Sequence, residues 1–445
     1  MKSISTLNLE NAMARCGQSG RGSPKNQLCS ISLKRSAPGS NIHRPFHILF
    51  IVENNSVPVD IRVWREAVAA KEAGCHVSVI SPKNKQFSKK YEIIDGIEIY
   101  RHPMRPKDAG IINQAIEYAN ALFWEAILSA KIFLKRRFDV IHGANPPDHI
   151  FLLALAFRLA GVKYIFDHHD LAPELYISKF NRNKDILYCL LKLMEKLSCL
   201  VADVIICTNQ SCKLSDIERS KVKQEKIFVV RNDPSLQRNT TCYKEVNEKK
   251  INDDNIILLY VGSINIQDGM RDLMKVVHIL VNQFKQTMIH CRVIGDGDDL
   301  FRVKQLCEEL KMNKYFSFLG YVYDRETVRK HIVESDICLE PAPDNEVNSK
   351  STFIKVMEYM AEGKPIVAFD MAETRFSAEG AALMVEPGNH YAFAEAIMRL
   401  IGDPKLRRHM GEFGRVKINT ELNWCNASRE LYQAYRAIRI NSNQL

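Results

Sequence analysis

Residues 47–80 read HILFIVENNSVPVDIRVWREAVAAKEAGCHVSVI, and this stretch decides the fold class. It opens with a short, mostly apolar run, which predicts a buried strand, and a polar loop follows. Asp60 is a favourable N-cap for the next helix, because its side chain can accept a hydrogen bond from the first turn. Gly74 ends that helix, and residues 76–80 are the next strand. Strand, loop, helix and strand in this order form the repeating unit of a parallel α/β sheet.

The same pattern recurs along the rest of the chain. In the first half, further strands are expected at residues 138–142, 163–166, 203–207 and 226–230. A polar, charged segment at 237–254 has the composition of a linker. Beyond it, a second set of strands is expected at residues 256–260, 287–294, 316–319, 337–340, 365–369 and 382–385. The sequence therefore predicts an α/β protein with two facing, doubly wound Rossmann-like domains.

The pattern divides the chain into four segments. Residues 1–44 are rich in Ser, Gly, Lys and Arg and lack hydrophobic periodicity, which predicts a disordered basic leader. This leader is either an inert extension or an anchor to anionic lipid. We expect the first domain at residues 45–240 and the second at 241–425. Residues 426–445 are expected to form a helix and tail that cross back to the first domain.

Composition narrows the class of protein. Of the 445 residues, 46% are hydrophobic and 26% are charged, as in an ordinary globular protein. The formal net charge of +10 suits an anionic partner such as a nucleotide phosphate or an anionic lipid. Aromatic residues are not interleaved with the basic runs, so we expect no nucleic-acid partner. No run reaches the roughly 18 apolar residues of a membrane span.

The 12 cysteines are scattered singly along the chain. The closest pair, Cys207 and Cys212, is not a C-x-x-C motif, so the sequence gives no support for a zinc ribbon or a redox site. Scattered cysteines suit reduced thiols, and we expect a cytoplasmic protein.

A series of short motifs carries a resemblance to a known family. The motifs are SVPVD (56–60), RVWRE (62–66), DHHD (167–170), PELY (173–176), YVG (260–262), QDG (267–269), GDG (295–297), STFIK (351–355) and EYMAEGKP (358–365). In this order and spacing they resemble the family 4 retaining glycosyltransferases, and most of all the branch that acts in bacterial surface-polysaccharide assembly. The resemblance runs from about residue 46 to 438 and implies the GT-B architecture of two facing Rossmann-like domains.

The resemblance also implies an activity. It implies hexosyl transfer from a UDP- or GDP-linked sugar to a sugar or polyprenyl-linked acceptor, with retention of the anomeric configuration. It implies neither a permanently bound cofactor nor a bound metal. The first domain would be the acceptor side, and the second would bind the nucleotide sugar.

Donor residues are expected in the second domain. Residues 350–365 suggest a loop and then a helix that begins near Ser351, and the free N–H groups of a helix N-terminus favour phosphate. The family resemblance implies that Glu358, two turns further along, accepts hydrogen bonds from the donor ribose. Gly262 follows a strand, where a backbone without a side chain can approach phosphate. The expected donor-binding residues are Gly262, Gly269, Arg271, Gly295, Tyr321, Lys350, Ser351, Thr352, Lys355 and Arg375.

Two positions depart from the family pattern. Lys350 stands where the family has a glutamate that contacts the donor sugar, and Asp268 stands where many members have a lysine. An ammonium group can only donate hydrogen bonds, whereas a carboxylate would accept them from sugar hydroxyls. We therefore expect Lys350 to hold phosphate, and Arg271 or Lys355 to replace the charge that is missing at position 268.

The first domain is expected to carry the reacting end of the site. The DHHD motif ends a strand at the carboxyl edge of the sheet, where open α/β sheets bind ligands. The resemblance places His169 against the donor sugar, with Asp170 orienting it. With Glu358 these are the residues that we assign to catalysis, although a core histidine is the alternative. The expected acceptor residues are Asn55, Pro58, Asp60, Arg62 and His168, and a helix cap with a surface arginine is the alternative for that loop.

Two helical stretches of the first domain, at 127–137 and 186–200, are both apolar and basic. Such helices suit peripheral contact with an anionic membrane, where a polyprenyl-linked acceptor would lie, so we expect the protein at the inner face of the plasma membrane. Core-facing helices with solvated lysines are the alternative. Two rival functions also stay open. They are a sugar-nucleotide epimerase of the same fold and an inactive nucleotide-sugar-binding scaffold.

Overall fold

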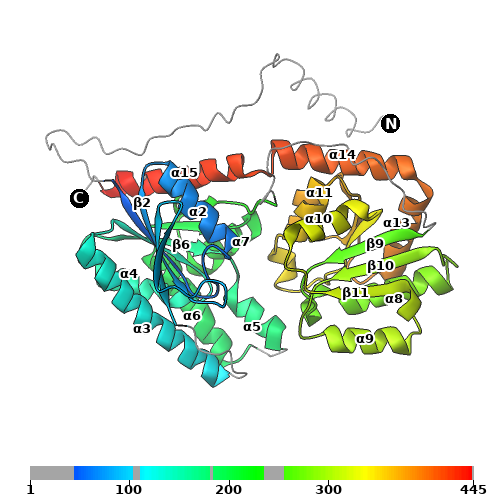
Figure 1. The fold of residues 1–445 in the computed structure, drawn as a ribbon, viewed down its shortest axis with the longest axis horizontal. Helices are drawn as coiled ribbons and strands as arrows, with labels where there is room; N and C mark the ends of the chain where they lie inside the picture. The colour runs from blue at the N-terminus through cyan, green and yellow to red at the C-terminus, as the bar shows by residue number, and fades with distance from the viewer. Residues whose placement is uncertain (1–44, 104–110, 181–183, 235–254, 443–445) are drawn as a thin grey trace, which may run out of the picture.

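The computed structural model describes residues 45–103, 111–180, 184–234 and 255–442. These residues form two α/β domains, one on an eight-stranded sheet and the other on a six-stranded sheet (Figure 1). The predicted leader and the predicted linker at 237–254 lie outside the described residues.

The first sheet confirms the strands expected in the first half of the chain. Its order is β3-β4-β2-β1-β5-β6-β7-β8, and neighbouring strands are parallel except β3 and β4. Because the order reverses between β1 and β5, the topological switch point lies at their carboxyl ends. The strands are β1 (His47–Val52), β2 (His76–Pro82), β3 (Tyr91–Ile94), β4 (Ile97–His102), β5 (Val140–Ala144), β6 (Lys163–His168), β7 (Val204–Cys207) and β8 (Ile227–Val229).

The hairpin of β3 and β4 at the edge of this sheet is an element that we did not predict. Its turn is formed by Asp95 and Gly96, which have φ angles of 49° and 72°. Two consecutive positive φ angles are what a two-residue hairpin turn with the right twist requires. The Asp-Gly pair between apolar residues is the signal in the sequence that indicates this hairpin.

Helices cover both faces of the first sheet. One face is covered by α2 (Ile61–Glu72) and α15 (Trp424–Ser442), which share a hydrophobic core. The other face is covered by α3 (Ile111–Lys135), α4 (Phe151–Arg158) and α6 (Ile186–Val201), and α7 (Gln210–Ser220) adds to the same core. Helix α5 (Ala172–Phe180) packs against α6. Asp60 caps α2 as predicted, because its Oδ1 accepts a hydrogen bond from the Val63 amide at 3.0 Å.

The second sheet is parallel throughout and has the doubly wound order β11-β10-β9-β12-β13-β14. Its switch point lies between β9 and β12. The strands are β9 (Ile256–Val261), β10 (Ile289–Ile294), β11 (Phe316–Gly320), β12 (Ile337–Glu340), β13 (Ile366–Phe369) and β14 (Ala382–Val385). Helices α8 (Met270–Asn282), α9 (Leu300–Glu309) and α13 (His390–Gly402) cover one face, whereas α10 (Arg325–Glu334), α11 (Ile354–Ala361), α12 (Ala372–Ala378) and α14 (Pro404–Thr420) contribute to the core on the other.

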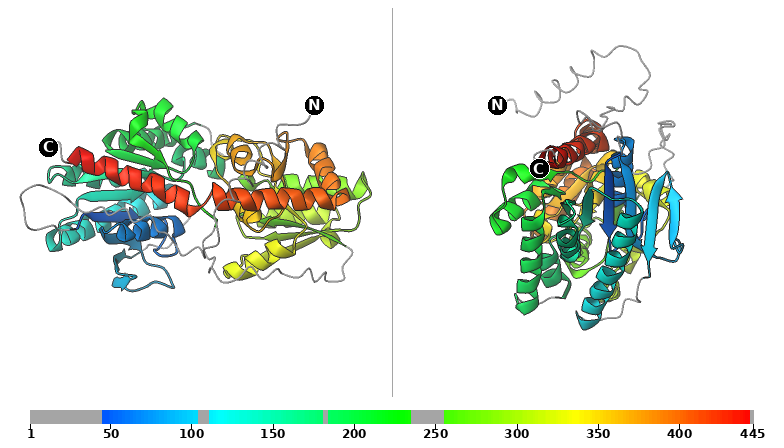
Figure 2. Two further views of the ribbon diagram at one scale, coloured as in Figure 1. Left: turned by 90° about the horizontal axis from the view of Figure 1, so that it is seen from above. Right: turned by 90° about the vertical axis from the view of Figure 1, so that its left-hand side faces the viewer.

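The last helix crosses back to the first domain, as expected. Figure 2 shows α14 over the second domain and α15 continuing along the same line over the first. The side chains of Leu431, Ala434, Tyr435 and Ile438 are fully buried in the core that α15 shares with α2. The C-terminal helix therefore belongs to the first domain by packing, although it follows the second in the sequence.

Two further expectations can be compared with the described residues. No helix among them is both long and apolar enough to cross a membrane. The nine cysteines that the structure describes are free thiols, and most of them are buried.

The packing of α15 leads to a prediction about stability. Leu431→Ala should lower the free energy of unfolding by about 2–5 kcal/mol, because it removes a buried side chain and leaves a cavity. Gln433→Ala on the exposed side of the same helix is the matched control and should change stability by less than about 0.5 kcal/mol. Urea unfolding measures both. Equal stability of the two variants would show that α15 does not pack on the first domain.

Candidate functional site

The carboxyl edges of the two sheets contact each other. Asn209, which follows β7, donates hydrogen bonds through Nδ2 to the Lys350 carbonyl at 2.8 Å and to Thr352 Oγ1 at 3.1 Å. Glu373 on α12 accepts hydrogen bonds from Ser211 Oγ at 2.8 Å and from Arg231 Nη1 at 3.0 Å. Because open α/β sheets bind ligands at these edges, the site is expected where the two domains meet.

Two glycines allow the backbone at the carboxyl edge of the second sheet to pack closely. Gly295 follows β10 with a φ of 149°, and a Cβ atom there would lie 1.8 Å from the Gly262 carbonyl oxygen. Gly269 has a φ of 77°, and a Cβ atom there would lie 1.9 Å from the carbonyl oxygen of Pro341. Both positions therefore require glycine for steric reasons. The close packing brings the backbone segments after β9 and β10 into direct contact with each other.

Lys355 lies directly against Gly262, the residue after β9. We call this position the glycine turn. Its Nζ is 3.0 Å from Glu340 Oε2 and 3.1 Å from the Tyr260 hydroxyl, and a Cβ atom at Gly262 would lie 3.2 Å from it. Burial alone would lower the pKa of Lys355, but the Glu340 carboxylate raises it above its ordinary value. The lysine is therefore held in the charged form at the switch point of the second sheet.

The helix beside this turn begins later than we predicted. Helix α11 starts at Ile354, and a short 3-10 helix, η5 (Asn348–Lys350), precedes it. Ser351 is outside the helix, and its hydroxyl donates to the Val347 carbonyl at 2.8 Å. Thr352 accepts its hydrogen bond from Asn209 of the first domain. Both hydroxyls are thus engaged by protein groups, and the expectation that the helix N-terminus lies at Ser351 is wrong.

Glu358 lies on the second turn of α11. Its carboxylate pairs with Arg325 at the start of α10, and its side chain is largely buried. Burial raises the pKa of Glu358, and the arginine opposes that rise. The structure therefore gives this carboxylate one cationic partner.

The arginines expected at the donor phosphates are already paired. The Arg271 guanidinium binds both oxygens of Asp299, and Nε lies 2.7 Å from Oδ2. Arg375 is on α12, and it binds Asp370 in the same way, with Nε at 2.8 Å from Oδ1. In both arginines the carboxylate occupies Nε and Nη2, and it neutralises the charge that a phosphate would otherwise meet.

The two positions that depart from the family pattern have structural partners. Asp268 ends η3 (Ile266–Asp268), and its Oδ2 accepts a hydrogen bond from the Asn265 amide at 2.9 Å in a capping box. Lys350 reaches toward the first domain, where its Nζ lies 4.0 Å from Glu174 Oε1 on α5. Asp268 therefore shapes the turn before Gly269, whereas Lys350 lies at the contact between the domains.

Tyr321 follows β11, the neighbour of β10. Its ring is 63% exposed and meets the exposed ring of Tyr323 edge-on, with 4.7 Å between centroids. Exposed aromatic rings at this edge can stack on a planar base.

In the first domain, Asp167 at the end of β6 is the centre of a buried polar cluster. Its Oδ1 accepts a hydrogen bond from Arg62 Nη2 at 2.9 Å, and its Oδ2 lies 2.5 Å from His169 Nε2. The same Oδ2 lies 3.5 Å from Nε2 of His142 on β5. Burial would raise the pKa of Asp167, but the charge of Arg62 outweighs it and holds the pKa well below the ordinary value.

Arg62, which we expected to contact the acceptor, is held by groups of the first domain. Its side chain is 10% exposed, and besides Asp167 it binds Glu66 Oε1 at 3.2 Å, the Val230 carbonyl at 2.8 Å and Asn232 Oδ1 at 3.1 Å. All of these partners lie within the first domain. Arg62 therefore organises the domain, because both of its Nη atoms are engaged by protein groups.

His168 also differs from the expectation. Its side chain is fully buried, with Nδ1 at 2.8 Å from Asp216 Oδ1, and its ring stacks on Phe166. Burial would lower the pKa of His168, but Asp216 raises it to about 10. His168 is thus a core ion-pair residue and cannot contact an acceptor. The alternation of side chains along β6 places Asp167 and His168 on opposite faces of the sheet.

The remaining residues expected around the acceptor lie after β1, and Asp170, which we assigned to catalysis, lies after β6. Asn55 and Asp170 are exposed, Pro58 is half-buried, and Asp60 is engaged as the helix cap. The turn that carries His169 and Asp170 is held by Asn145, whose Oδ1 accepts hydrogen bonds from both backbone amides at 2.5 and 3.1 Å.

Asp167 and Asn145 are the two residues of this site whose roles we did not predict. We had expected Asp170 to orient His169, whereas the carboxylate that contacts the ring is that of Asp167. Asn145 stands in the Gly-Ala-Asn-Pro-Pro stretch after β5. A polar residue at the end of a strand next to the switch point is the only signal for it in the sequence.

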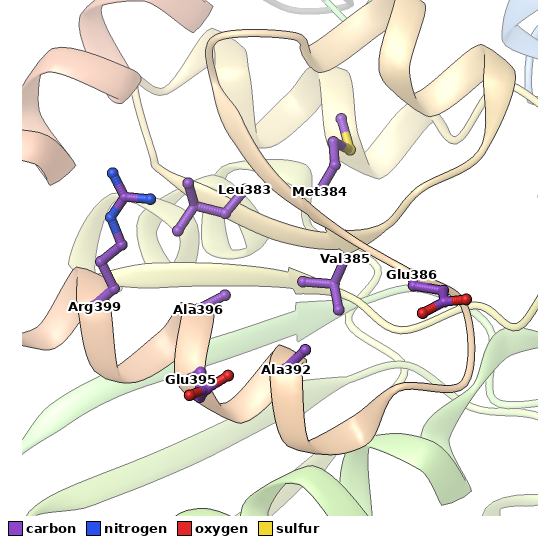
Figure 3. Close-up of a pocket in the computed structure, with 8 residues that line it drawn as sticks. All are labelled: Leu383, Met384, Val385, Glu386, Ala392, Glu395, Ala396 and Arg399. Carbon is purple, nitrogen blue, oxygen red and sulfur yellow. The ribbon is translucent and has the colours of Figure 1, made fainter.

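A hollow of 370 Å³ lies elsewhere, at the edge of the second domain between β14 and α13 (Figure 3). The apolar side chains of Leu383, Val385 and Ala392 line it together with the charged Glu386 and Arg399. None of the expected site residues lines this hollow, so we do not assign the donor to it.

Comparison with known proteins agrees with this geometry. The family model described as Glycosyltransferase Family 4 matches residues 59–232, and the model described as Glycosyl transferases group 1 matches residues 244–417. The chain is 24% identical over 258 residues to the capsular polysaccharide biosynthesis glycosyltransferase CapM of Staphylococcus aureus. The alignment covers 54% of this chain and 63% of CapM. It thus spans less than two thirds of that relative, and only 12% of a second curated relative.

Solved structures share the fold. Sucrose-phosphate synthase of Thermosynechococcus elongatus superposes with a TM-score of 0.71 at 18% identity, over 89% of this chain and 100% of that one. HepE of Anabaena in complex with UDP-glucose superposes with a TM-score of 0.61 at 15% identity, over 88% of this chain and 99% of that one. With one family model matching each domain, the chain belongs to the family 4 glycosyltransferases of the GT-B fold.

Proposed function

We propose that this glycosyltransferase takes a hexose from a UDP- or GDP-linked donor and transfers it, with retention, to a sugar or polyprenyl-linked acceptor in polysaccharide assembly. The observation that carries the proposal is the charged Lys355 against the glycine turn at the switch point of the second sheet. A charged ammonium beside a glycine turn at the carboxyl edge of a parallel sheet suits a diphosphate. The name of CapM and the UDP-glucose bound to HepE support the reaction class and the donor class.

The donor would lie along the carboxyl edge of the second sheet. We assign the diphosphate to Lys355 and the backbone around Gly262, and the ribose to Glu358, which would then share its charge with Arg325. Tyr321 would stack on the base, because its exposed ring lies at the neighbouring strand end. No metal is required in this scheme, since Lys355 supplies positive charge at the phosphates.

The reaction would proceed on one face of the donor sugar. The bond from the anomeric carbon to the phosphate oxygen breaks, and the acceptor oxygen bonds to the same face of that carbon. The acceptor proton passes to the leaving phosphate. Asp167 fixes Nε2 of His169, and we assign the rest of that ring to the donor sugar, where it supports the developing charge.

Helices α3, α4 and α6 cover one face of the first sheet, and their outer surface would contact the membrane that holds a polyprenyl-linked acceptor. Large apolar side chains are exposed on all three helices or at their ends, among them Leu134 at 86%, Leu159 at 98% and Ile186 at 89%. Lys131 and Lys196 are exposed on the same helices, whereas the acidic Glu125 and Glu195 are buried. An apolar surface with exposed cations suits an anionic bilayer.

An inactive nucleotide-sugar-binding scaffold is the second candidate function. It is favoured by the pairing of Arg271 and Arg375 with carboxylates, which leaves fewer free cations for a leaving diphosphate. Release of nucleoside diphosphate that depends on an added acceptor would exclude it.

Donor binding tests the proposed function. Binding of either UDP- or GDP-sugars, but not both, should raise the melting temperature, because a ligand of the native state stabilises it. Glu358→Ala should weaken the Kd for that donor by roughly 10-fold to 100-fold, corresponding to about 1.5–3 kcal/mol for a charge-assisted hydrogen bond. Glu326→Ala on exposed α10 is the matched control. An unchanged Kd in Glu358→Ala would remove the ribose assignment.

The same titration distinguishes two roles for Lys350. If the residue holds phosphate, Lys350→Ala raises the Kd for the donor. The loss of affinity is smaller at high salt, because screening already suppresses the attraction between Lys350 and the phosphate. Lys350→Glu should weaken binding further by repulsion. If the residue only contacts Glu174 across the domains, the donor Kd stays unchanged in Lys350→Ala.

The adjacent histidines provide a matched pair for the first domain. His169→Ala should lower kcat far more than donor affinity and leave the melting temperature nearly unchanged, because the ring is at the edge of the site. His168→Ala should instead destabilise the fold by about 3–5 kcal/mol, since it leaves the buried Asp216 carboxylate without its partner. Thermal unfolding and steady-state kinetics separate the two. Full turnover in His169→Ala would show that the ring is structural.

Vesicle binding tests the membrane face. The protein should cosediment with phosphatidylglycerol vesicles more than with phosphatidylcholine vesicles, and less as salt increases. Leu159→Glu with Ile186→Glu should abolish this binding. Phe301→Glu, at an exposed apolar residue of the second domain, is the control and should bind normally. If Phe301→Glu loses binding instead, a different surface meets the lipid.

A further inference from the structure

Three ionisable side chains from separate elements converge at the carboxyl end of the first sheet. Glu53 follows β1 directly, Glu125 lies on α3, and His149 lies in the short 3-10 helix η1 (Asp148–Ile150) before α4. One atom from each side chain lies within 4.8 Å of the corresponding atoms of the other two. Glu125 is fully buried, Glu53 is 5% exposed and the side chain of His149 is 14% exposed.

These side chains lack the partners that buried ionisable groups normally have. Both carboxylate oxygens of Glu53 and of Glu125, and Nε2 of His149, make no hydrogen bond within the part of the chain that the structure describes. His149 Nε2 lies 3.3 Å from Glu53 Oε2. Buried carboxyl groups are ordinarily hydrogen-bonded, paired with a cation or bound to a metal. The Glu125 carboxylate, aimed into the cluster without a partner, therefore points to a missing ligand.

We propose that Glu53, Glu125 and His149 bind a divalent transition-metal ion of the zinc class. Two carboxylates and one imidazole are a donor set that suits such ions, whereas calcium and magnesium prefer sites made of oxygen ligands alone. Metal–ligand bonds of about 2.0–2.1 Å in a tetrahedron separate two ligand atoms by about 3.3–3.4 Å. The distance between His149 Nε2 and Glu53 Oε2 already matches that edge. Three protein ligands leave a position for water.

Three other clusters among the described residues contain comparable groups, and each is better explained without a metal. In the cluster of Glu66, His142 and Asp167, Arg62 supplies the positive charge from 2.9 Å. The other two clusters share Asp216, with Cys207 and Cys212 in one and with His168 and Cys199 in the other, and this aspartate is already paired with His168 at 2.8 Å. Within the described residues, no arginine or lysine forms an ion pair with Glu53 or Glu125, so these two carboxylates would balance the charge of the ion.

The bound ion would join three segments of the first domain. It would connect the loop that begins at Glu53 and carries Asn55 and Pro58 to α3 and to η1. This site is separate from Lys355 and the donor residues, so the proposal does not depend on the proposed function. The metal would fix the shape of the acceptor side and take no part in phosphate binding.

The test uses the full chain, stripped of metal with a chelator and titrated with Zn²⁺ by calorimetry and with Co²⁺ by absorption spectroscopy. We expect one ion per chain, visible Co²⁺ bands typical of oxygen and nitrogen ligands, and no thiolate charge-transfer band. Glu125→Gln keeps the shape of the side chain but removes its charge, and it should weaken the Kd by about 10-fold to 100-fold. Glu308→Gln, at an exposed glutamate of α9, is the matched control and should bind normally.

Two results would overturn the proposal. One is the absence of stoichiometric binding to the wild-type chain. The other is an unchanged Kd in Glu125→Gln, and a thiolate band there would place the ion at Cys207 and Cys212 instead. Circular dichroism of the metal-free variants checks the fold. If Glu125→Gln does not fold, the metal Kd of His149→Gln is measured instead, because His149 is the least buried of the three proposed ligands. A raised Kd supports the site, and an unchanged Kd overturns it.

Discussion

The buried ion pair of Arg62 and Asp167 is the interaction on which the first domain depends. Arg62 comes from α2 and Asp167 from the end of β6, so the pair joins the two sides of the switch point. The same guanidinium binds the Val230 carbonyl and Asn232 at the start of the segment that leads to the second domain. Through His142 the cluster also meets the Tyr435 hydroxyl of α15, at 3.3 Å. Because a buried charge without its partner is costly, the turn that carries His169, the interdomain segment and the crossover helix are held in one arrangement.

The second domain is organised by a different constraint, the close packing of backbone at its switch point. Gly269 and Gly295 leave no room for side chains, and Lys355 is held beside Gly262 by Glu340. Several other charges near this edge, including Arg271, Arg325 and Arg375, are engaged with carboxylates. A nucleotide sugar that binds here would therefore exchange these ion pairs for its own phosphates and hydroxyls. The affinity for the nucleotide sugar would then depend on how strongly the carboxylates hold the arginines, as well as on the arginines themselves.

Much of the architecture could be predicted from local sequence. Apolar runs of strand length, separated by helical patterns, indicated both sheets, because buried parallel strands are apolar throughout and need a crossover helix between them. Asp60 could be identified as a cap because the hydrogen bond to Val63 is local. The hairpin at Asp95 and Gly96 carried an equally local signal that we did not use. The start of α11 was misplaced because Ser351 satisfies its hydroxyl at Val347 and Thr352 satisfies its own at Asn209, a residue of the other domain.

Local sequence was enough to predict the fold class, the family motifs and the edge of each sheet at which the candidate site residues lie. The burial and the partners of each candidate side chain depend on how the whole chain folds. His168 and His169 are neighbours in one motif, yet the first is buried against Asp216 and the second lies at the edge of the site against Asp167. Arg62 and Lys350 likewise found partners more than a hundred residues away, in Asp167 and Glu174. The physical reason is that a charged group is placed by whichever opposite charge and burial the folded chain brings to it, and these contacts are not encoded in local spacing.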